Sequence, residues 1–341
     1  MTQPVILWFR RDLRLSDQQA LAAAVASSAP VIPVYILDDK SPKHRKMGGA
    51  SRWWLHHSLA SLDADLQAIG SRLLLLRGKS DAVLGSLVEE TGAKAIHCIR
   101  HYEPWWRNAE KAVAKALPEG CQLNCHDGNY LLALGSVTTG SGGQYKIYTP
   151  FMRALWQHMP PHDPLPAPRN LHAPECWPKS ETLSDWKLLP TRPDWAGGMK
   201  DIWSPGEAGA KARLDAFADK AKYYDEKRNL PSITGSSFLS PHLHFGEISA
   251  ATCWHKTMSA GGSVDVFLKE LVWRDYAQNV ICQFPEYGSK NARDAFDMMP
   301  WRDLDEPLVK ANFTAWTKGQ TGYPIVDAAM RPELDRTLRE I

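Results

Sequence analysis

The first 130 residues alternate between short apolar runs and helical stretches, and this alternation constrains the fold more than any other feature. Five apolar runs have the length and the β-rich composition of strands, and they span residues 5–9, 31–37, 72–77, 95–99 and 122–125. Helical stretches lie between them at residues 17–27, 51–69, 80–90 and 104–116. Because parallel strands need long crossover connections, this order favours a parallel sheet. The pattern predicts an α/β domain over residues 1–130 with a doubly wound, five-stranded parallel sheet.

The rest of the chain has a different character. Residues 131–205 contain a Gly/Ser/Thr loop at 135–143 and a Pro- and Trp-rich stretch without periodicity, which indicates a long interdomain connection. From residue 206 onward the pattern is helical, with no strand alternation and no internal repeat. The expected helices span 207–221, 249–259, 264–283 and 308–318. The second domain, residues 206–341, is therefore predicted to be all-α.

Composition narrows the class of protein without naming a function. Hydrophobic residues make up 44% of the chain and charged residues 23%, which are ordinary values for a folded globular protein. No apolar run approaches the ~20 residues that span a bilayer, and the N-terminus lacks a secretory pattern, so we expect a cytoplasmic protein without a membrane partner. The 40 basic and 38 acidic residues neither indicate nor exclude a nucleic-acid partner. The six cysteines contain no C-x-x-C pair and are expected to be reduced and buried.

Several common motifs are absent from the sequence. No G-x-G-x-x-G follows the first strand, the Walker-like glycine spacing at 135–140 lacks its lysine, and neither H-E-x-x-H nor G-x-S-x-G occurs. The pairs His56–His57 and His242–His244 lack the i, i+4 spacing of a helical metal site. We therefore predict no metal site and none of these motif-based activities.

Two segments offer ligand chemistry but also have a purely structural interpretation. The segment WFRRDLRLSD at 8–17 places three arginines at the carboxyl end of the first strand, where an open α/β sheet binds ligands. Taken alone, a salt-bridged strand exit is the favoured interpretation. The segment GSSFLSPHLHFGEIS at 235–249 has N–H and O–H donors that can hold a diphosphate. It fits equally well a helix N-cap at Ser240 followed by a first-turn Pro241.

A third segment, ELVWRDY at 270–276, combines three functional groups on one predicted helix. Glu270, Trp273 and Arg274 share a side at i, i+3 and i+4. A carboxylate, an aromatic plane and a guanidinium suit stacking on a base and hydrogen bonding to its edge. A helix surface with a Glu270–Arg274 ion pair and a half-buried tryptophan is slightly favoured on local grounds.

Taken together, these segments resemble the DNA photolyase/cryptochrome family, and most of all its bacterial cyclobutane pyrimidine dimer photolyases. The resemblance also covers GGASRWWLHHSLASLDADL at 48–66, YDEKRNLP at 224–231 and AWTKGQTGYPIVDAAMR at 315–331, in the family's order. It implies an N-terminal antenna-type α/β domain and a C-terminal helical domain that holds FAD. It also implies UV-damaged DNA as the partner and a possible antenna chromophore, folate or deazaflavin, beside residues 48–66.

The resemblance assigns roles to individual residues. The implied FAD contacts are Tyr224, Arg228, Ser236, Ser237, Phe238, Leu239, Ser240 and Arg274. The five consecutive residues would wrap the diphosphate, although Phe238 stands where the family usually has arginine. Glu270, Trp273 and Arg274 would lie at the dimer side of the pocket, and Trp316 would be the surface end of an electron-transfer chain. The implied reaction is light-driven: excited, reduced FAD gives an electron to the pyrimidine dimer, the cyclobutane ring splits and the electron returns.

The family's sequences continue well beyond the GYPIVDAAMR stretch, whereas here only a short segment follows it. We therefore expect a truncated or internally deleted member with half of its FAD pocket missing and impaired activity. Apolar faces at Val266, Phe267, Val272 and Ile281 should then be exposed. Two other functions stay open: a cryptochrome-like photoreceptor, and a non-catalytic remnant of the antenna domain.

Overall fold

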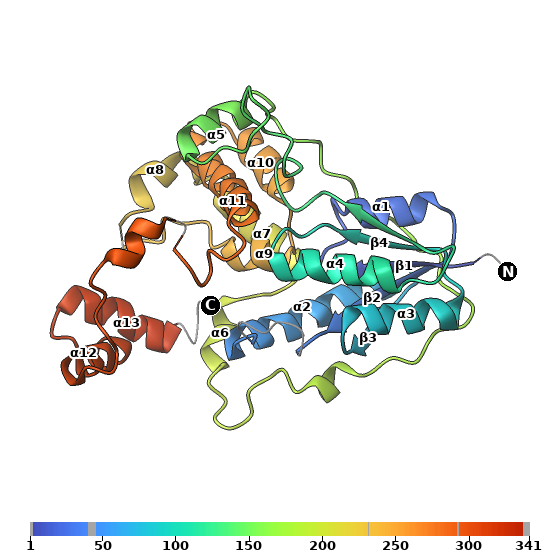
Figure 1. Ribbon diagram of the computed structural model, residues 1–341, viewed down its shortest axis with the longest axis horizontal. Coiled ribbons are helices and arrows are strands. Elements are labelled where there is room, and N and C mark those ends of the chain that lie inside the picture. The colour runs from blue at the N-terminus through green and yellow to red at the C-terminus, as the bar shows by residue number, and fades with distance from the viewer. Residues whose placement is uncertain (1–2, 40–45, 231, 292, 337–341) are drawn as a thin grey trace. The chain divides into compact units, whose positions relative to one another are not determined.

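The computed structural model of the chain describes residues 3–39, 46–230, 232–291 and 293–336 (Figure 1). The chain divides into two compact units. The first comprises residues 1–46, 57–186 and 205–285, and the second comprises 47–56, 187–204 and 286–341. The domain boundaries expected at residues 130 and 206 stay a prediction. Among the described residues, no helix combines the length and the hydropathy that crossing a membrane requires.

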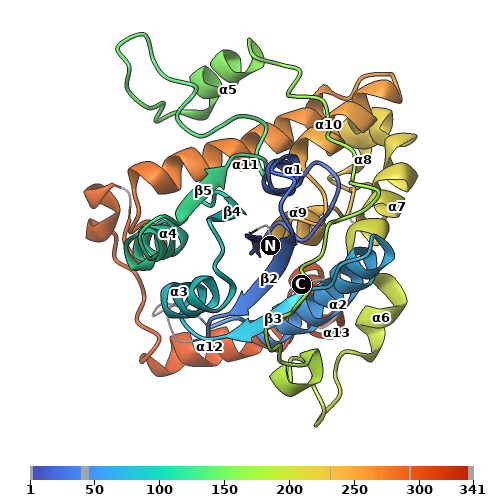
Figure 2. The ribbon, with the colours of Figure 1, turned by 90° about the vertical axis from the view of Figure 1, so that its right-hand side faces the viewer.

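The sheet has five parallel strands in the order β3-β2-β1-β4-β5, as the strand–helix alternation predicted. Its strands are β1 (Val5–Phe9), β2 (Val31–Leu37), β3 (Leu74–Arg77), β4 (Ala95–Ile99) and β5 (Gln122–His126). Every residue of β1 and β2 is buried, which is typical of parallel strands covered on both faces. Helices α3 (Ser80–Thr91) and α4 (Pro104–Ala116) cover one face, and α1 (Gln19–Ala26) covers the other (Figure 2). Helix α2 (Gly49–Ala68) joins β2 to β3.

Helices dominate the chain after β5, and α11 (Asp265–Gln283) is central to the helical core of the first unit. The other elements are α5 (Tyr148–Trp156), η1 (Leu183–Trp186), α6 (Gly197–Ile202), α7 (Glu207–Ala218), η2 (Ala221–Tyr223), α8 (Tyr224–Lys227), α9 (Ser240–Phe245), α10 (Ala250–Ser259), η3 (Asp294–Met298), α12 (Pro307–Thr317) and α13 (Pro324–Arg336). The sequence predicted that four apolar residues of α11 are exposed. This prediction is wrong for two of them, because Phe267 is 3% and Val272 0% exposed. Both belong to a core that also takes in residues of α5, α7 and α10. Val266 and Ile281 are half-buried.

Within the first unit, α9 ends directly against the chain that leaves β1. Gly246 ends α9 with a φ of +67°. A Cβ at this position would lie 2.1 Å from the carbonyl oxygen of Arg11, so only glycine fits without a backbone shift. Leu13 N–H donates to the carbonyl of Phe245 at 3.1 Å, and Arg14 Nη1 donates to the carbonyl of Gly246 at 2.9 Å. Backbone contacts therefore fix α9 beside the carboxyl end of the sheet.

Tryptophan is abundant in this chain, with 14 residues, and part of the excess is structural. Trp8 lies in the core between the sheet and helices α3 and α4, and it is 1% exposed. In the second unit, Trp54 packs edge-to-face on Trp203 with ring centroids 5.2 Å apart, and Trp195 lies against Gly49. These rings fill core space.

Candidate functional site

Two of the three arginines that follow β1, Arg10 and Arg14, point inward. Arg10 is 2% exposed, forms an ion pair with Glu110 at 2.8 Å and donates to the carbonyl of Ile99. Arg14 donates to the carbonyls of Asp17 and Gly128 and to Asn129 Oδ1, at 2.8–2.9 Å. Buried guanidinium groups with this many partners tie loops together, which confirms the structural interpretation of the WFRRDLRLSD segment.

Residues 235–240 form a loop, called the serine loop below, that lies close against α8. A Cβ on Gly235 would approach the carbonyl oxygen of Lys227 to 2.2 Å, so the two backbones are nearly in contact. Leu239 anchors the other end of the loop in the helical core, where it is 1% exposed. Between them the backbone turns at Phe238, whose φ is +55°. The N-cap predicted at Ser240 is wrong: Ser240 is the first residue of α9, and the cap position is Leu239, which forms no side-chain cap.

This loop leaves hydrogen-bond donors available. Ser236 and Ser240 are exposed, and within the described chain nothing accepts from their hydroxyls or from the backbone N–H groups of Ser236 and Ser237. The hydroxyl of Ser237 accepts from Leu239 N–H at 3.3 Å. Neutral donors gathered at one turn suit phosphate oxygens. The donor set therefore fits the diphosphate of FAD.

Arg213, on α7, is a residue that the sequence analysis missed. Its guanidinium lies 5.6 Å from the ring centroid of Phe238, so a positive charge reaches the loop at the position where the family usually has arginine. Burial lowers the pKa of Arg213 below its usual value. No local sequence signal connects the two residues, because they are 25 positions apart and meet only in the folded chain.

Tyr224, Arg228 and Glu270 form one contact group. Tyr224 is buried against the edges of Phe217 and Phe267, with ring centroids 5.7 and 5.5 Å away. The guanidinium of Arg228 lies 5.0 Å from the Tyr224 ring centroid and forms an ion pair with Glu270. The hydrogen bond that Arg228 donates to Glu270 raises the pKa of Arg228. The ion pair expected within α11, between Glu270 and Arg274, is therefore replaced by a pair between α11 and α8.

Trp273 stacks on Tyr148 of α5. The ring centroids lie 3.4 Å apart and the planes differ by 4°, while Tyr276 meets both rings at an angle. Trp273 is 44% exposed, and the Tyr148 hydroxyl donates to the carbonyl of Lys269 at 3.2 Å. Burial, together with the charge of Glu270, raises the pKa of Tyr148 to about 12. The indole of Trp273 is therefore half-exposed and held on one face by the Tyr148 ring. Tyr148 is a second residue that the sequence analysis missed.

The third residue predicted on this side of α11, Arg274, has partners of its own. Its guanidinium donates to the carbonyls of Asn129 and Leu243 and lies 4.4 Å from the ring centroid of Tyr130. The three functional side chains predicted on one side of α11 therefore have three different sets of partners. The contacts of Arg274 fasten α11 to α9 and to the loop after β5. Its predicted roles toward FAD and DNA stay predictions.

The neighbouring Asp275 is buried and accepts from the N–H groups of Leu131 and Leu132. Burial raises the pKa of Asp275 from 3.8 to about 7, although Arg274 and the two N–H groups oppose this shift. The folded state therefore holds this proton more tightly than the unfolded state does. Stability from this group is complete below pH ~4 and declines as the pH rises toward 7.

We expect Asp275→Asn to keep the backbone hydrogen bonds and remove this pH dependence. The free energy of unfolding of the variant should increase relative to the unchanged protein between pH 5 and 7, by up to about 1.4 kcal/mol per pH unit. Urea unfolding at pH 5, 6, 7 and 8 measures the difference. A difference that stays constant across this range would contradict the assignment.

Trp316 lies on α12 in the second unit and is 45% exposed, beside Phe313. Its predicted place in an electron-transfer chain stays a prediction.

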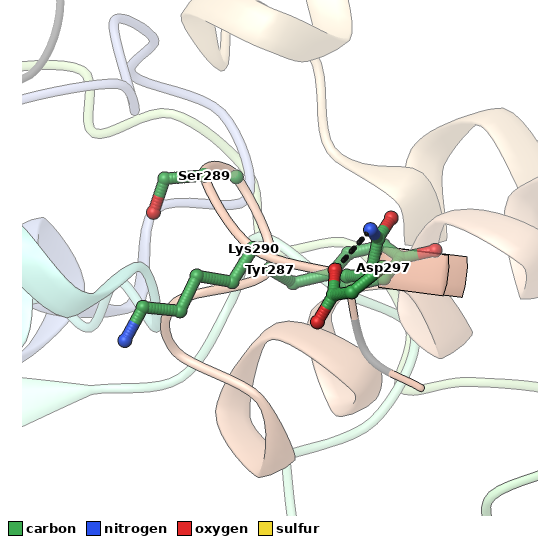
Figure 3. Close-up of a pocket in the computed structure, with 6 residues that line it drawn as sticks. Tyr287, Ser289, Lys290 and Asp297 are labelled. Carbon is green, nitrogen blue, oxygen red and sulfur yellow. Dashed lines mark hydrogen bonds between the residues drawn. The ribbon is translucent and has the colours of Figure 1, made fainter. Parts of the chain in front are cut away.

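A shallow cavity of about 320 Å³ also belongs to the second unit, and Tyr287, Lys290 and Asp297 are among its lining residues (Figure 3). It contains none of the predicted site residues. Among the described residues, no group of three or more His, Cys, Asp or Glu side chains could hold a metal ion.

The chain is similar to known proteins over nearly all of its length. The family model described as DNA photolyase matches residues 5–169, and the model described as FAD binding domain of DNA photolyase matches residues 267–337. The deoxyribodipyrimidine photo-lyase of Agrobacterium fabrum is 48% identical over 97% of this chain and 69% of its own length. That of a Synechococcus strain is 36% identical, over 97% and 70%. The crystal structure of a bacterial class III photolyase from Agrobacterium tumefaciens superposes with a TM-score of 0.90 at 47% identity, over 97% of this chain and 69% of that one.

A parallel α/β sheet followed by a FAD-binding helical region defines a class of flavoprotein. Within that class, the chain belongs to the DNA photolyase/cryptochrome family, as its sequence segments predicted. The chain spans about 70% of the length of the two relatives.

Proposed function

We propose that this chain is a light-driven DNA-repair enzyme, a deoxyribodipyrimidine photo-lyase that splits cyclobutane pyrimidine dimers. The observation that carries the proposal is one arrangement within the first unit. It consists of the donor-rich serine loop, the Arg228–Glu270 pair and the half-exposed Trp273, in a chain 48% identical to a photolyase of this name.

FAD is the cofactor that this arrangement fits. The hydroxyls of Ser236 and Ser240 and the N–H groups of Ser236 and Ser237 would hold its diphosphate, with Arg213 supplying positive charge nearby. Bound and reduced, FAD supplies the electron that light drives into the dimer. We also propose an antenna chromophore of the folate or deazaflavin class near residues 48–66, and the support for it is the resemblance of that segment.

The lesion side of the site would be built on α11. A pyrimidine dimer stacks poorly in duplex DNA, so turning it out of the helix costs less than turning out normal bases. The exposed indole of Trp273 offers it an aromatic face, and the carboxylate of Glu270 can accept from pyrimidine N–H groups. Arg228 compensates the charge of Glu270 through their ion pair.

The test uses the purified full chain and an oligonucleotide that carries one cyclobutane dimer. We expect heat to release FAD and blue light to restore the dimer to two pyrimidines, with no conversion in the dark. FAD occupancy well below one per chain and slow repair would agree with the expected loss of half of the pocket. Bound FAD without repair would instead indicate a cryptochrome-like photoreceptor. A folded chain that takes up no FAD from solution would contradict the proposal.

A variant separates the cofactor contact from general damage to the fold. The double change Ser236→Ala and Ser240→Ala removes both free hydroxyls, and we expect FAD affinity to fall about tenfold, since two phosphate hydrogen bonds are lost. Ser232→Ala, at an exposed serine outside the turn, is the matched control and should bind FAD normally. Fluorescence titration with free FAD measures both variants, and equal affinities would remove the loop from the site.

A further inference from the structure

Two cysteines face each other across the last pair of strands. In the register of β4 and β5, Cys98 lies directly opposite Cys125. Their sulfur atoms are 3.6 Å apart and share a hydrogen bond. Neighbouring strands lie about 4.8 Å apart, and a disulfide accepts Cα separations of about 4.4–6.8 Å. The backbone spacing is therefore suitable, and side-chain rotation can bring the sulfur atoms into bonding distance.

The two thiols differ in access. Cys98 is 0% exposed in the core between the sheet and helices α3 and α4. Cys125 is half-buried, and it lies on β5, one of the two edge strands of the sheet. A small oxidant in solution therefore reaches Cys125 first, and Cys98 is placed to react only with its neighbour.

The charges around the pair also differ between the two sulfur atoms. The hydrogen bond from Cys98 lowers the pKa of Cys125, and the positive charges of Arg10 and Arg100 act in the same direction, while burial and the negative charge of Glu110 oppose them. The same hydrogen bond and deeper burial raise the pKa of Cys98 well above its usual value. Of the two sulfur atoms, that of Cys125 therefore ionises more easily, and the thiolate is the form that reacts with peroxides.

We propose that Cys98 and Cys125 are a modification site, a dithiol that hydrogen peroxide converts to an intrachain disulfide. In the first step, the Cys125 thiolate attacks one peroxide oxygen, the O–O bond breaks, and a sulfenic acid and hydroxide form. In the second step, the Cys98 sulfur attacks the sulfenic sulfur, and water leaves with the Cys98 proton. Two electrons pass from the two sulfur atoms to the peroxide, so the step needs no other reactant. The disulfide would fasten the edge strand β5 to β4 beside Arg10.

The first experiment treats the full chain with hydrogen peroxide in a Cys176→Ser background, because Cys176 is exposed and would otherwise react between molecules. We expect two of the remaining thiols to disappear with a mass loss of about 2 Da. Peptide mapping should join Cys98 to Cys125, and dithiothreitol should restore both thiols. A sulfinic acid at Cys125, or a disulfide to a different cysteine, would overturn the proposal, as would a pair that stays reduced at peroxide doses that oxidise exposed thiols.

Variants of the pair test the order of the two steps. Cys98→Ala should stop at the sulfenic acid of Cys125, which dimedone traps, and Cys125→Ser should leave Cys98 unreactive. Cys121→Ser is the matched control, since it lies next to β5 and is half-buried like Cys125, and it should form the disulfide normally. Trapping at Cys98 in place of Cys125 would contradict the order. The experiment in the Cys176→Ser background decides the existence of the disulfide even where a variant of the pair fails to fold.

Discussion

Replacing Gly246 with alanine should lower the free energy of unfolding by about 3 kcal/mol or more, because two costs combine at this residue. A non-glycine residue in the left-handed region costs about 1–2 kcal/mol. The new Cβ would also lie 2.1 Å from the carbonyl oxygen of Arg11, and a backbone atom cannot rotate away as a side chain can. To relieve this overlap, α9 must move away from the segment that follows β1. This movement weakens the hydrogen bond between Leu13 and Phe245.

Gly92 provides the matched control. It ends α3 with the same φ of +67°, but nothing lies within 4 Å of the position that a Cβ would take. Gly92→Ala should therefore cost only the conformational term, about 1–2 kcal/mol. Urea unfolding of both variants isolates the overlap as the difference between them. Equal losses of stability would show that the contact between α9 and the strand exit relaxes freely.

Gly246 also shows which kind of feature cannot be predicted from a sequence. The five strands could be predicted because period and length are local properties, and each strand begins within two residues of its expected start. The overlap at Gly246 could not be predicted, since it depends on two backbones that are 235 positions apart in the chain. The same limit applies to Phe267 and Val272, whose cover comes from helices elsewhere in the sequence.

The candidate site shows this limit within a single helix. The i, i+4 spacing correctly places Glu270 and Arg274 one turn apart, but spacing alone does not choose between partners on the same helix and on another. Here Arg228, the residue that caps the C-terminus of α8, pairs with Glu270, and the carbonyl of Asn129 in the loop after β5 accepts from Arg274. Tyr148 and Arg213 were missed for the same reason. Each acts on a predicted residue only through a contact between distant segments.

The proposed function makes Trp273 a major source of affinity for damaged DNA. Stacking of a base on an aromatic side chain contributes about 1–3 kcal/mol, so Trp273→Ala should weaken binding to a dimer-containing duplex about 5- to 150-fold. Binding to the undamaged duplex should change little, because phosphate contacts dominate it. Both affinities must be measured at one salt concentration. An equal loss on both duplexes would assign Trp273 to general DNA contact.

Tyr148 tests whether the indole must be held in place. The stacked ring at 3.4 Å fixes the plane of Trp273 before DNA arrives, so its removal adds the entropy of ordering an exposed side chain to the cost of binding. Tyr148→Ala should therefore weaken lesion binding by a smaller factor, about 3- to 10-fold for the ~0.5–1.5 kcal/mol of one immobilised side chain. Tyr148→Phe keeps the ring and loses only the hydrogen bond to Lys269, so it should bind the lesion almost normally. If Tyr148→Phe were as weak as Tyr148→Ala, the hydroxyl and not the stack would be the group that matters, and the indole would need no support from α5.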